Sequence, residues 1–365
     1  MTDAGQRRLP ALDWLRGLVM VLMALDHASG TFNAGRLVTD SSVLYRPGTP
    51  LPAAQFFTRW VTHVCAPAFV FLAGAALALS IEKHRARGEA AGATDRFILA
   101  RGLLIAVLDP VWMSWVFAPG RVLFQVLYAI GGGLVLMVPL RRLSDRALLG
   151  TALVLVFGGE ALTGAALALV GGTPTLPVAL LLTGGDFGRL IVAYPLLPWL
   201  AIMLLGWCFG RYLVATGPAR AARLLVAAGL AALLLFVVVR GVDGYGNMRL
   251  ARDDGSLVQW LHVSKYPPSL AYVALELGLV ALGLGLALRR VLGRRLVVLG
   301  QAALFFYLLH VHLLTLAAWT LGLHHRGGLA ATYAATVVAL ALLYPLCDRY
   351  RAYKQAHPDG WPRYV

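Results

Sequence analysis

Residues 147–170 read ALLGTALVLVFGGEALTGAALALV, an apolar run whose one charged side chain is Glu160. At 1.5 Å per residue, such a run can cross about 30 Å of hydrocarbon as a helix. Lipid offers the backbone no hydrogen-bond partners, so each membrane-crossing run is expected to be helical. The same pattern recurs along the chain, and it predicts membrane spans at 9–29, 61–82, 97–117, 122–140, 147–170, 191–213, 221–240, 267–288, 297–321 and 329–347.

The composition of the whole chain is that of an integral membrane protein. Of its 365 residues, 59% are hydrophobic and 13% are charged, against about a quarter charged in a soluble domain. We therefore predict an all-α polytopic helical bundle of about ten transmembrane helices. Residues 1–350 are expected to form one membrane domain, and residues 351–365 a short cytoplasmic tail.

The net charge of +15 comes from short arginine clusters between the apolar runs. This distribution is typical of the loops that orient a membrane protein, and it argues against binding to nucleic acid. With the N-terminus inside, the clusters at 141–146 and 289–295 both fall on the cytoplasmic side. The pattern thus predicts that both termini are cytoplasmic.

The first predicted span carries the densest set of charges, in LDWLRGLVMVLMALDH at 12–27. Ionisable groups inside a span are costly and by default suggest function. Arg16 and His27 are eleven residues apart, so they share one helix face about 16 Å apart along the axis. Alternatively, Arg16 pairs with Asp13 or snorkels to the headgroups, and His27 is a wetted interfacial side chain. Asp26 either pairs with another span or orients the imidazole.

Other polar side chains interrupt the apolar runs. They are His63, Asp109, Gln125, Glu160, Glu276 and His310. Each of them alone is also explained by a buried hydrogen bond. His310 and His312 lie about 200° apart on a helix, so they cannot share a metal ion, and we expect no metal. The long outer loops 30–60 and 241–266 are expected either to cap a polar pocket or to be simply solvated.

Five blocks of the sequence together resemble a known family. They are RLPALDWLRGLVMVLMALDH (8–27), RWVTHVCAPAFVFLAGAALAL (59–79), YPLLPWLAIMLLGWCFGR (194–211), KYPPSLAYVALELG (265–278) and FFYLLHVHLL (305–314). They are similar to the bacterial relatives of heparan-α-glucosaminide N-acetyltransferase, within the transmembrane acyltransferase superfamily. The Arg-x10-His spacing of Arg16 and His27 also resembles the first-helix motif of the acyltransferase-three family.

The resemblance implies transfer of an acyl group, in the first instance an acetyl group, from cytosolic acyl-CoA to an extracytoplasmic polar acceptor such as a glycan. It implies a bacterial inner-membrane protein in contact with lipid, and it allows a homodimer. His27 is then the catalytic base or acyl carrier, with Asp26 beside it. The lysosomal enzyme has an asparagine at the position of Asp26 and a catalytic histidine about eleven residues after it, where this chain has Leu37. Either His27 takes over that role or this chain uses different chemistry.

The remaining candidate residues are assigned to the two substrates. We expect Arg16, Asp109 and His310 to contact acetyl-CoA or another acyl-CoA, and His63 and Lys265 to hold the acceptor. The pantetheine arm of CoA is of the same order as the spacing of about 16 Å along the first span. An imidazole at its outer end suits either a general base or a transient acyl carrier.

Two other classes of function remain open from the sequence. A proton-coupled transporter or exporter would use Asp109, Glu160 and Glu276 with the histidines as a relay, and kinking prolines would suit alternating access. A non-catalytic scaffold explains the charges at two depths less well.

Overall fold

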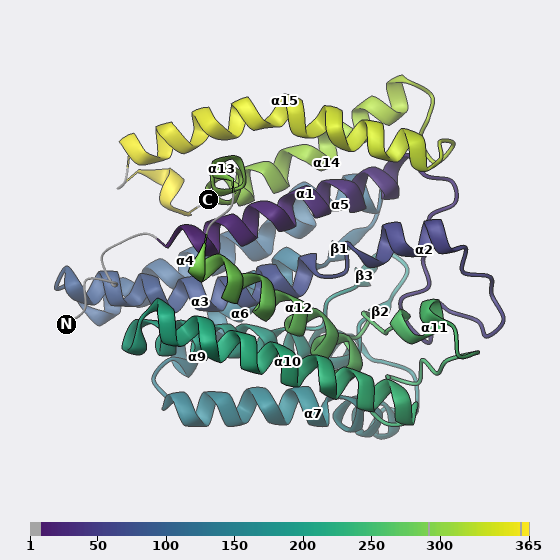
Figure 1. The fold of residues 1–365 in the computed structure, drawn as a ribbon, viewed down its shortest axis with the longest axis horizontal. Coiled ribbons are helices and arrows are strands. Elements are labelled where there is room, and N and C mark those ends of the chain that lie inside the picture. Colours follow the sequence, from purple (N-terminus) through teal and green to yellow (C-terminus); the bar gives the residue numbers. More distant parts are fainter. Residues whose placement is uncertain (1–8, 291–292, 358–359, 365) are drawn as a thin grey trace.

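The computed structural model describes residues 9–290, 293–357 and 360–364, apart from the side chains of 362 and 363. The structure is one bundle of helices, most of which lie roughly along its long axis (Figure 1). They are α1 (Pro10–Phe32), α2 (Ala53–Trp60), α3 (Cys65–Ala86), α4 (Ala91–Leu108), α5 (Ser114–Phe117), α6 (Val126–Leu140), α7 (Asp145–Leu169), α8 (Leu176–Val178), α9 (Leu196–Thr216), α10 (Pro218–Val242), α11 (Leu257–Leu261), α12 (Leu270–Arg289), α13 (Arg294–Gln301), α14 (Ala303–Thr320) and α15 (Leu329–Ala356).

Within these described residues, eight helical segments are long and apolar enough to cross a membrane. They are Ala53–Ala86, Ala91–Phe117, Asp145–Leu169, Leu196–Thr216, Pro218–Val242, Leu270–Arg289, Ala303–Thr320 and Leu329–Ala356. The other two predicted spans correspond to α1, which carries three charged side chains, and to α6, which has 15 residues. The prediction of an all-α polytopic bundle is confirmed.

The two ends of the bundle differ in what they carry. α1 begins and α15 ends at one end, whereas α2, α11 and the long loops lie at the other (Figure 1). This placement agrees with an even number of crossings. Which end faces the cytoplasm stays a prediction. α15 continues without a break to Ala356, past the boundary expected at residue 350.

Two predicted spans begin later than expected, because their first residues are strands. β1 (Val122–Phe124) pairs in parallel with β3 (Leu190–Val192), and β3 pairs antiparallel with β2 (Gly185–Asp186). The chain before α6 and α9 thus satisfies its backbone groups in a small sheet instead of an extra helical turn. Alternation of apolar residues over three positions is too short to reveal such strands in the sequence.

α1 runs through the middle of the bundle, between α13–α15 on one side and α3 and α12 on the other (Figure 1). Its crossing with α13 is unusually close. A Cβ atom on Gly17 would lie 1.8 Å from the carbonyl oxygen of Leu296, and one on Gly300 would lie 1.7 Å from that of Asp13. Only glycine allows these backbones to touch, and the contact fixes the position of the first turns of α1.

Gly17→Ala is therefore expected to destabilise the protein. The added methyl group meets backbone, which cannot rotate away, so overpacking should cost about 1–3 kcal/mol. Thermal unfolding of purified protein in detergent measures the shift. Gly150→Ala is the matched control, because Gly150 on α7 has no described atom within 4 Å of an added Cβ. Equal midpoints for the two variants would contradict the close crossing.

Candidate active site

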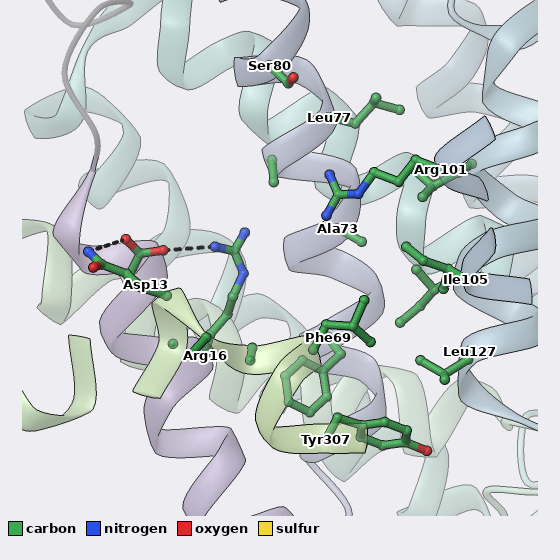
Figure 2. A pocket seen from close by; sticks show the side chains of 18 of the residues that line it. Asp13, Arg16, Phe69, Ala73, Leu77, Ser80, Arg101, Ile105, Leu127 and Tyr307 are labelled. Carbon is green, nitrogen blue, oxygen red and sulfur yellow. Dashed lines mark hydrogen bonds and ion pairs between the residues drawn. The ribbon is translucent and has the colours of Figure 1, made fainter. Parts of the chain in front are cut away.

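A cavity of about 290 Å³ lies beside the first half of α1. Three cationic side chains from three helices line it, namely Arg16 of α1, Arg101 of α4 and Lys354 of α15. Figure 2 shows Arg16 and Arg101 extending toward one another across this space, with Phe69 and Tyr307 farther along it. The site thus combines a cationic part with an apolar part.

The two arginines differ in their partners. Arg16 donates from Nη1 to Asp13 Oδ1 at 2.9 Å and from Nη2 to the carbonyl oxygen of Leu72 at 3.3 Å. The pairing with Asp13 that the spacing allows is therefore present, and Arg16 still lines the cavity. The buried Nε of Arg101 has no hydrogen-bond partner in the part of the chain that the structure describes. A phosphate group is the kind of ligand that such guanidinium groups hold well.

Tyr307 links the cavity to His27. The Tyr307 ring lines the cavity, and its centroid lies 6.1 Å from that of the His27 ring. On another side, His27 contacts Phe117 of α5 edge-on at 5.0 Å between centroids. The structure therefore places Arg16 at the cavity, whereas His27 is not among the described residues that line it and lies next to Tyr307.

His27 has a second histidine as its hydrogen-bond partner. Its Nδ1 lies 2.7 Å from Nε2 of His310, a fully buried residue of α14. His310 belongs to this pair and is not one of the residues lining the cavity among those described. Its neighbour His312 faces elsewhere, with Nε2 3.2 Å from the carbonyl oxygen of Trp112.

Asp26 binds two arginines instead of orienting the imidazole beside it. Its Oδ1 accepts from Arg59 Nη1 at 2.5 Å, from Arg36 Nη2 at 2.9 Å and from Thr62 Oγ1 at 3.0 Å. Of the two alternatives for Asp26, pairing with another element is the one observed. The end of α1 is thereby tied to α2 and to the loop that follows α1.

Arg59 connects Asp26 to a second buried carboxylate. It donates from Nε at 2.9 Å and from Nη2 at 2.5 Å to Asp40 Oδ2, and Asp40 Oδ1 lies 3.3 Å from Nε2 of His63. Burial alone raises the pKa of Asp40, but the Arg59 guanidinium and His63 outweigh it and hold that pKa well below its ordinary value. We refer to Asp26, Arg36, Asp40, Arg59 and His63 as the outer ion cluster, after the side of the membrane on which we expect them to lie.

Lys265 joins the outer ion cluster through its backbone. Its N–H donates to the carbonyl oxygen of Asp40 at 2.8 Å, and the residue is 4% exposed. Its Nζ lies 5.3 Å from the Tyr266 ring centroid and 6.0 Å from that of Tyr194. Burial raises the pKa of Tyr266, but Lys265 and Arg59 lower it to below its ordinary value. His63 and Lys265 are both expected to hold an acceptor, and both contact Asp40, His63 with its side chain and Lys265 with its backbone.

The two long loops at 30–60 and 241–266, which are expected on the outer side, contact each other, as a shared cap requires. Ser42 Oγ donates to the carbonyl oxygen of Met248 at 3.0 Å, and the Tyr45 hydroxyl hydrogen-bonds Asp253. The second loop is organised around Arg240, which is fully buried and donates to Asn247 Oδ1 at 2.8 Å and to backbone carbonyl oxygens. The loops are therefore packed structure and not simply solvated chain.

Asp109 and Glu160 are engaged elsewhere in the bundle. Asp109 Oδ2 accepts from the backbone N–H groups of Gln125 at 2.9 Å and Tyr128 at 2.6 Å, which are orphan donors at the start of α6. It does not line the cavity among the residues described. Glu160 accepts from the backbone of Gly246 and Met248 in the outer loop. Neither contact joins the two carboxylates into the relay that a proton-coupled transporter would use.

Sequence reasoning missed several residues of the site. Arg101 interrupts an apolar run, and that charge was a usable signal. Asp40 lies within the predicted loop 30–60, and Arg59 lies at its end, just before the second predicted span. Charged side chains are ordinary in loops and therefore do not indicate a site. Lys354 falls beyond the last predicted span, and nothing local relates it to α1.

The comparisons with known proteins bear on residues 8–240. This segment matches the model of a protein family described as heparan-alpha-glucosaminide N-acetyltransferase, catalytic. It contains Arg16, His27, Arg59 and Arg101, whereas His310 lies beyond it. A search of curated proteins found no match to the chain.

Proposed function

Since the chain belongs to the heparan-alpha-glucosaminide N-acetyltransferase catalytic family, we propose that it moves an acetyl group from acetyl-CoA across a membrane to a polar acceptor. Family membership implies a membrane-associated acetyltransferase. The cytosolic acyl-CoA donor, the extracytoplasmic acceptor such as a glycan, and a bacterial inner membrane as its location are our proposals.

The cavity beside α1 carries this proposal. Arg16, Arg101 and Lys354 supply positive charge for the phosphate groups of CoA, and the apolar stretch toward Tyr307 suits its thioester arm. The burial of Arg101 Nε without a described partner is consistent with a ligand that supplies one. A thioester bound in this direction would be presented toward His27.

His27 is proposed as the general base. Its Nε2 takes the proton from the acceptor hydroxyl or amine as that oxygen or nitrogen bonds to the thioester carbonyl carbon. The carbon–sulfur bond then breaks, and the departing CoA sulfur receives the proton from His27. The products are the acetylated acceptor and free CoA, so atoms and charge balance. Asp109 has no part in this scheme, because its carboxylate caps α6.

The acceptor is proposed to bind near the outer ion cluster. Lys265 and His63 both contact Asp40, and the packed outer loops cover this end of the bundle. Buried ammonium and imidazole groups favour a ligand rich in hydroxyl or acidic groups. This chemistry agrees with a glycan-type acceptor.

The direct test is acetyl transfer by the purified protein in lipid. Radiolabelled acetyl-CoA is supplied on one side of proteoliposomes, and a panel of amino sugars is supplied on the other. Release of CoA thiol together with label on an acceptor supports the proposal. Folded protein that neither binds CoA nor releases it from acetyl-CoA would overturn it, and proton-coupled flux of a solute would favour the transporter.

Arg101→Ala is expected to weaken CoA binding about 10-fold or more. A hydrogen bond to a charged group contributes about 1.5–3 kcal/mol, and the variant removes such a donor from the cavity. Titration calorimetry with CoA measures the dissociation constant. Arg223→Ala, an exposed arginine of α10, is the matched control for loss of one positive charge. Equal affinities for both variants would contradict a donor site between Arg16 and Arg101.

A further inference from the structure

A chain of two hydrogen bonds runs from the backbone of α14 to His27. Nδ1 of His310 lies 2.9 Å from the carbonyl oxygen of Phe306, and Nε2 of His310 lies 2.7 Å from Nδ1 of His27. His310 is 0% exposed. A fully buried imidazole strongly prefers its uncharged form, because no water stabilises the cation there.

The donors and acceptors in this chain can be assigned from the carbonyl end. A carbonyl oxygen only accepts, so Nδ1 of His310 carries the hydrogen. In a neutral ring, Nε2 of His310 is then an acceptor, and Nδ1 of His27 must donate to it. When the His27 ring is also neutral, its remaining nitrogen, Nε2, carries a lone pair that can accept a proton.

We infer that His310 is a positioning residue that fixes His27 as the tautomer with its hydrogen on Nδ1, so that Nε2 is free to accept a proton. This inference rests on the proposed function for its meaning in catalysis, but the tautomer itself can be observed without any reaction. The family-matched segment ends before His310, so the match does not assign it a role.

The tautomer decides whether His27 can act at all. With its hydrogen on Nε2, the ring would present a donor to the acceptor substrate and could not take its proton. With its hydrogen on Nδ1, Nε2 takes the acceptor proton as the new bond to the acyl carbon forms and the bond to sulfur breaks. The His27 cation keeps donating from Nδ1 to His310 until Nε2 returns its proton to the CoA sulfur.

Ring packing holds His310 in the required orientation. The Phe306 and His310 rings lie 4.9 Å apart between centroids with planes 16° from parallel, and the His27 and His310 planes differ by the same angle. His310→Phe keeps a flat ring in this place and removes both nitrogens. It is therefore the variant that separates hydrogen bonding from packing.

The first experiment is nitrogen-15 NMR of histidine-labelled full-length protein in lipid bilayers at a pH where the imidazoles are neutral. The chain has nine histidines, and comparison with His27→Gln identifies the His27 signals. We expect protonated Nδ1 and bare Nε2 in the wild type. In His310→Phe, a substantial fraction of His27 should carry its hydrogen on Nε2. A wild-type His27 protonated at Nε2, or a tautomer unchanged by His310→Phe, would overturn the inference.

The second experiment measures acetyl-CoA turnover. Loss of a tautomer-fixing carboxylate in a serine protease lowers kcat about 10⁴-fold, and for an uncharged partner we expect about 10²-fold in His310→Phe. The dissociation constant for CoA should not change. His310→Gln should regain part of the rate, because its amide oxygen can accept from His27.

His312→Phe is the matched control for the kinetic arm, since it lies two residues away on α14 and contacts Trp112 instead. It should retain wild-type turnover. Wild-type kcat in His310→Phe would overturn the inference even if His27 is essential. Conversely, normal turnover in His27→Gln would defeat the proposed function, and the NMR result would still decide the role of His310 on the tautomer.

Discussion

His27→Ala and His27→Gln proteins are expected to lose acetyl-CoA turnover by about 10²–10⁴-fold while remaining folded and still binding CoA. The reason is local, because His27 lies next to Tyr307, which lines the cavity proposed to hold the thioester. Glutamine preserves some hydrogen bonding but cannot take up a proton. A merely structural histidine would tolerate it.

The measurement is the release of CoA thiol under single-turnover conditions, with CoA affinity and thermal stability recorded for each variant. His324→Gln is a suitable control, because this histidine stacks on Trp319 at the end of α14 and does not contact His27 in the structure. If either His27 variant turned over at a near-normal rate, another buried histidine would have to be the base, and His63 or His310 would be next.

Arg59→Ala is expected to destabilise the protein by about 3–5 kcal/mol at neutral pH. The substitution removes the partner that Asp26 and Asp40 share and leaves buried carboxylates without it. Unfolding in detergent, followed by heat or denaturant, measures the loss. Arg142→Ala removes an arginine whose side chain is 67% exposed in its ion pair with Asp95, so it should change stability by less than about 1 kcal/mol.

The ion pair between Arg59 and Asp40 predicts that the stability of the protein depends on pH. The pKa of Asp40 is lower in the folded protein than in the unfolded chain, so its contribution is fully present above the unfolded value of about 4. The contribution is lost as the pH falls from there toward the folded value. Wild-type stability should thus drop on acidification more steeply than that of Arg59→Gln. Parallel pH profiles for the two proteins would show that Arg59 does not hold Asp40 ionised.

The helices could be predicted from the sequence because crossing a membrane demands length and apolarity, and both are local properties. The alignment of Arg16 with His27 followed from helical periodicity alone. The start of α6 was less predictable. It is capped by Asp109, which Pro110 follows, and this contact depends on how the chain turns between two helices. The π-helical turn at Asp109–Met113 and the strand that follows it have no clear local signature.

The pairings within the site could not be predicted in this way. His27 and His310 are 283 residues apart, and no periodicity relates residues on separate helices. His310 was expected at the acyl donor because it is polar and deep, which is all that its sequence context shows. Asp26 shows the same limit, since its partner Arg59 comes from a short helix that precedes the second span.

The central position of α1 has a consequence for how the molecule can be divided. The family-matched segment ends at Arg240, yet α1 packs against α12, α13, α14 and α15, all of which follow it. Tyr307 and Lys354, which line the cavity, also come from that later part. A chain cut after Arg240 would keep Arg16, His27 and Arg101 but leave α1 without these neighbours, so we expect that the matched segment does not fold on its own.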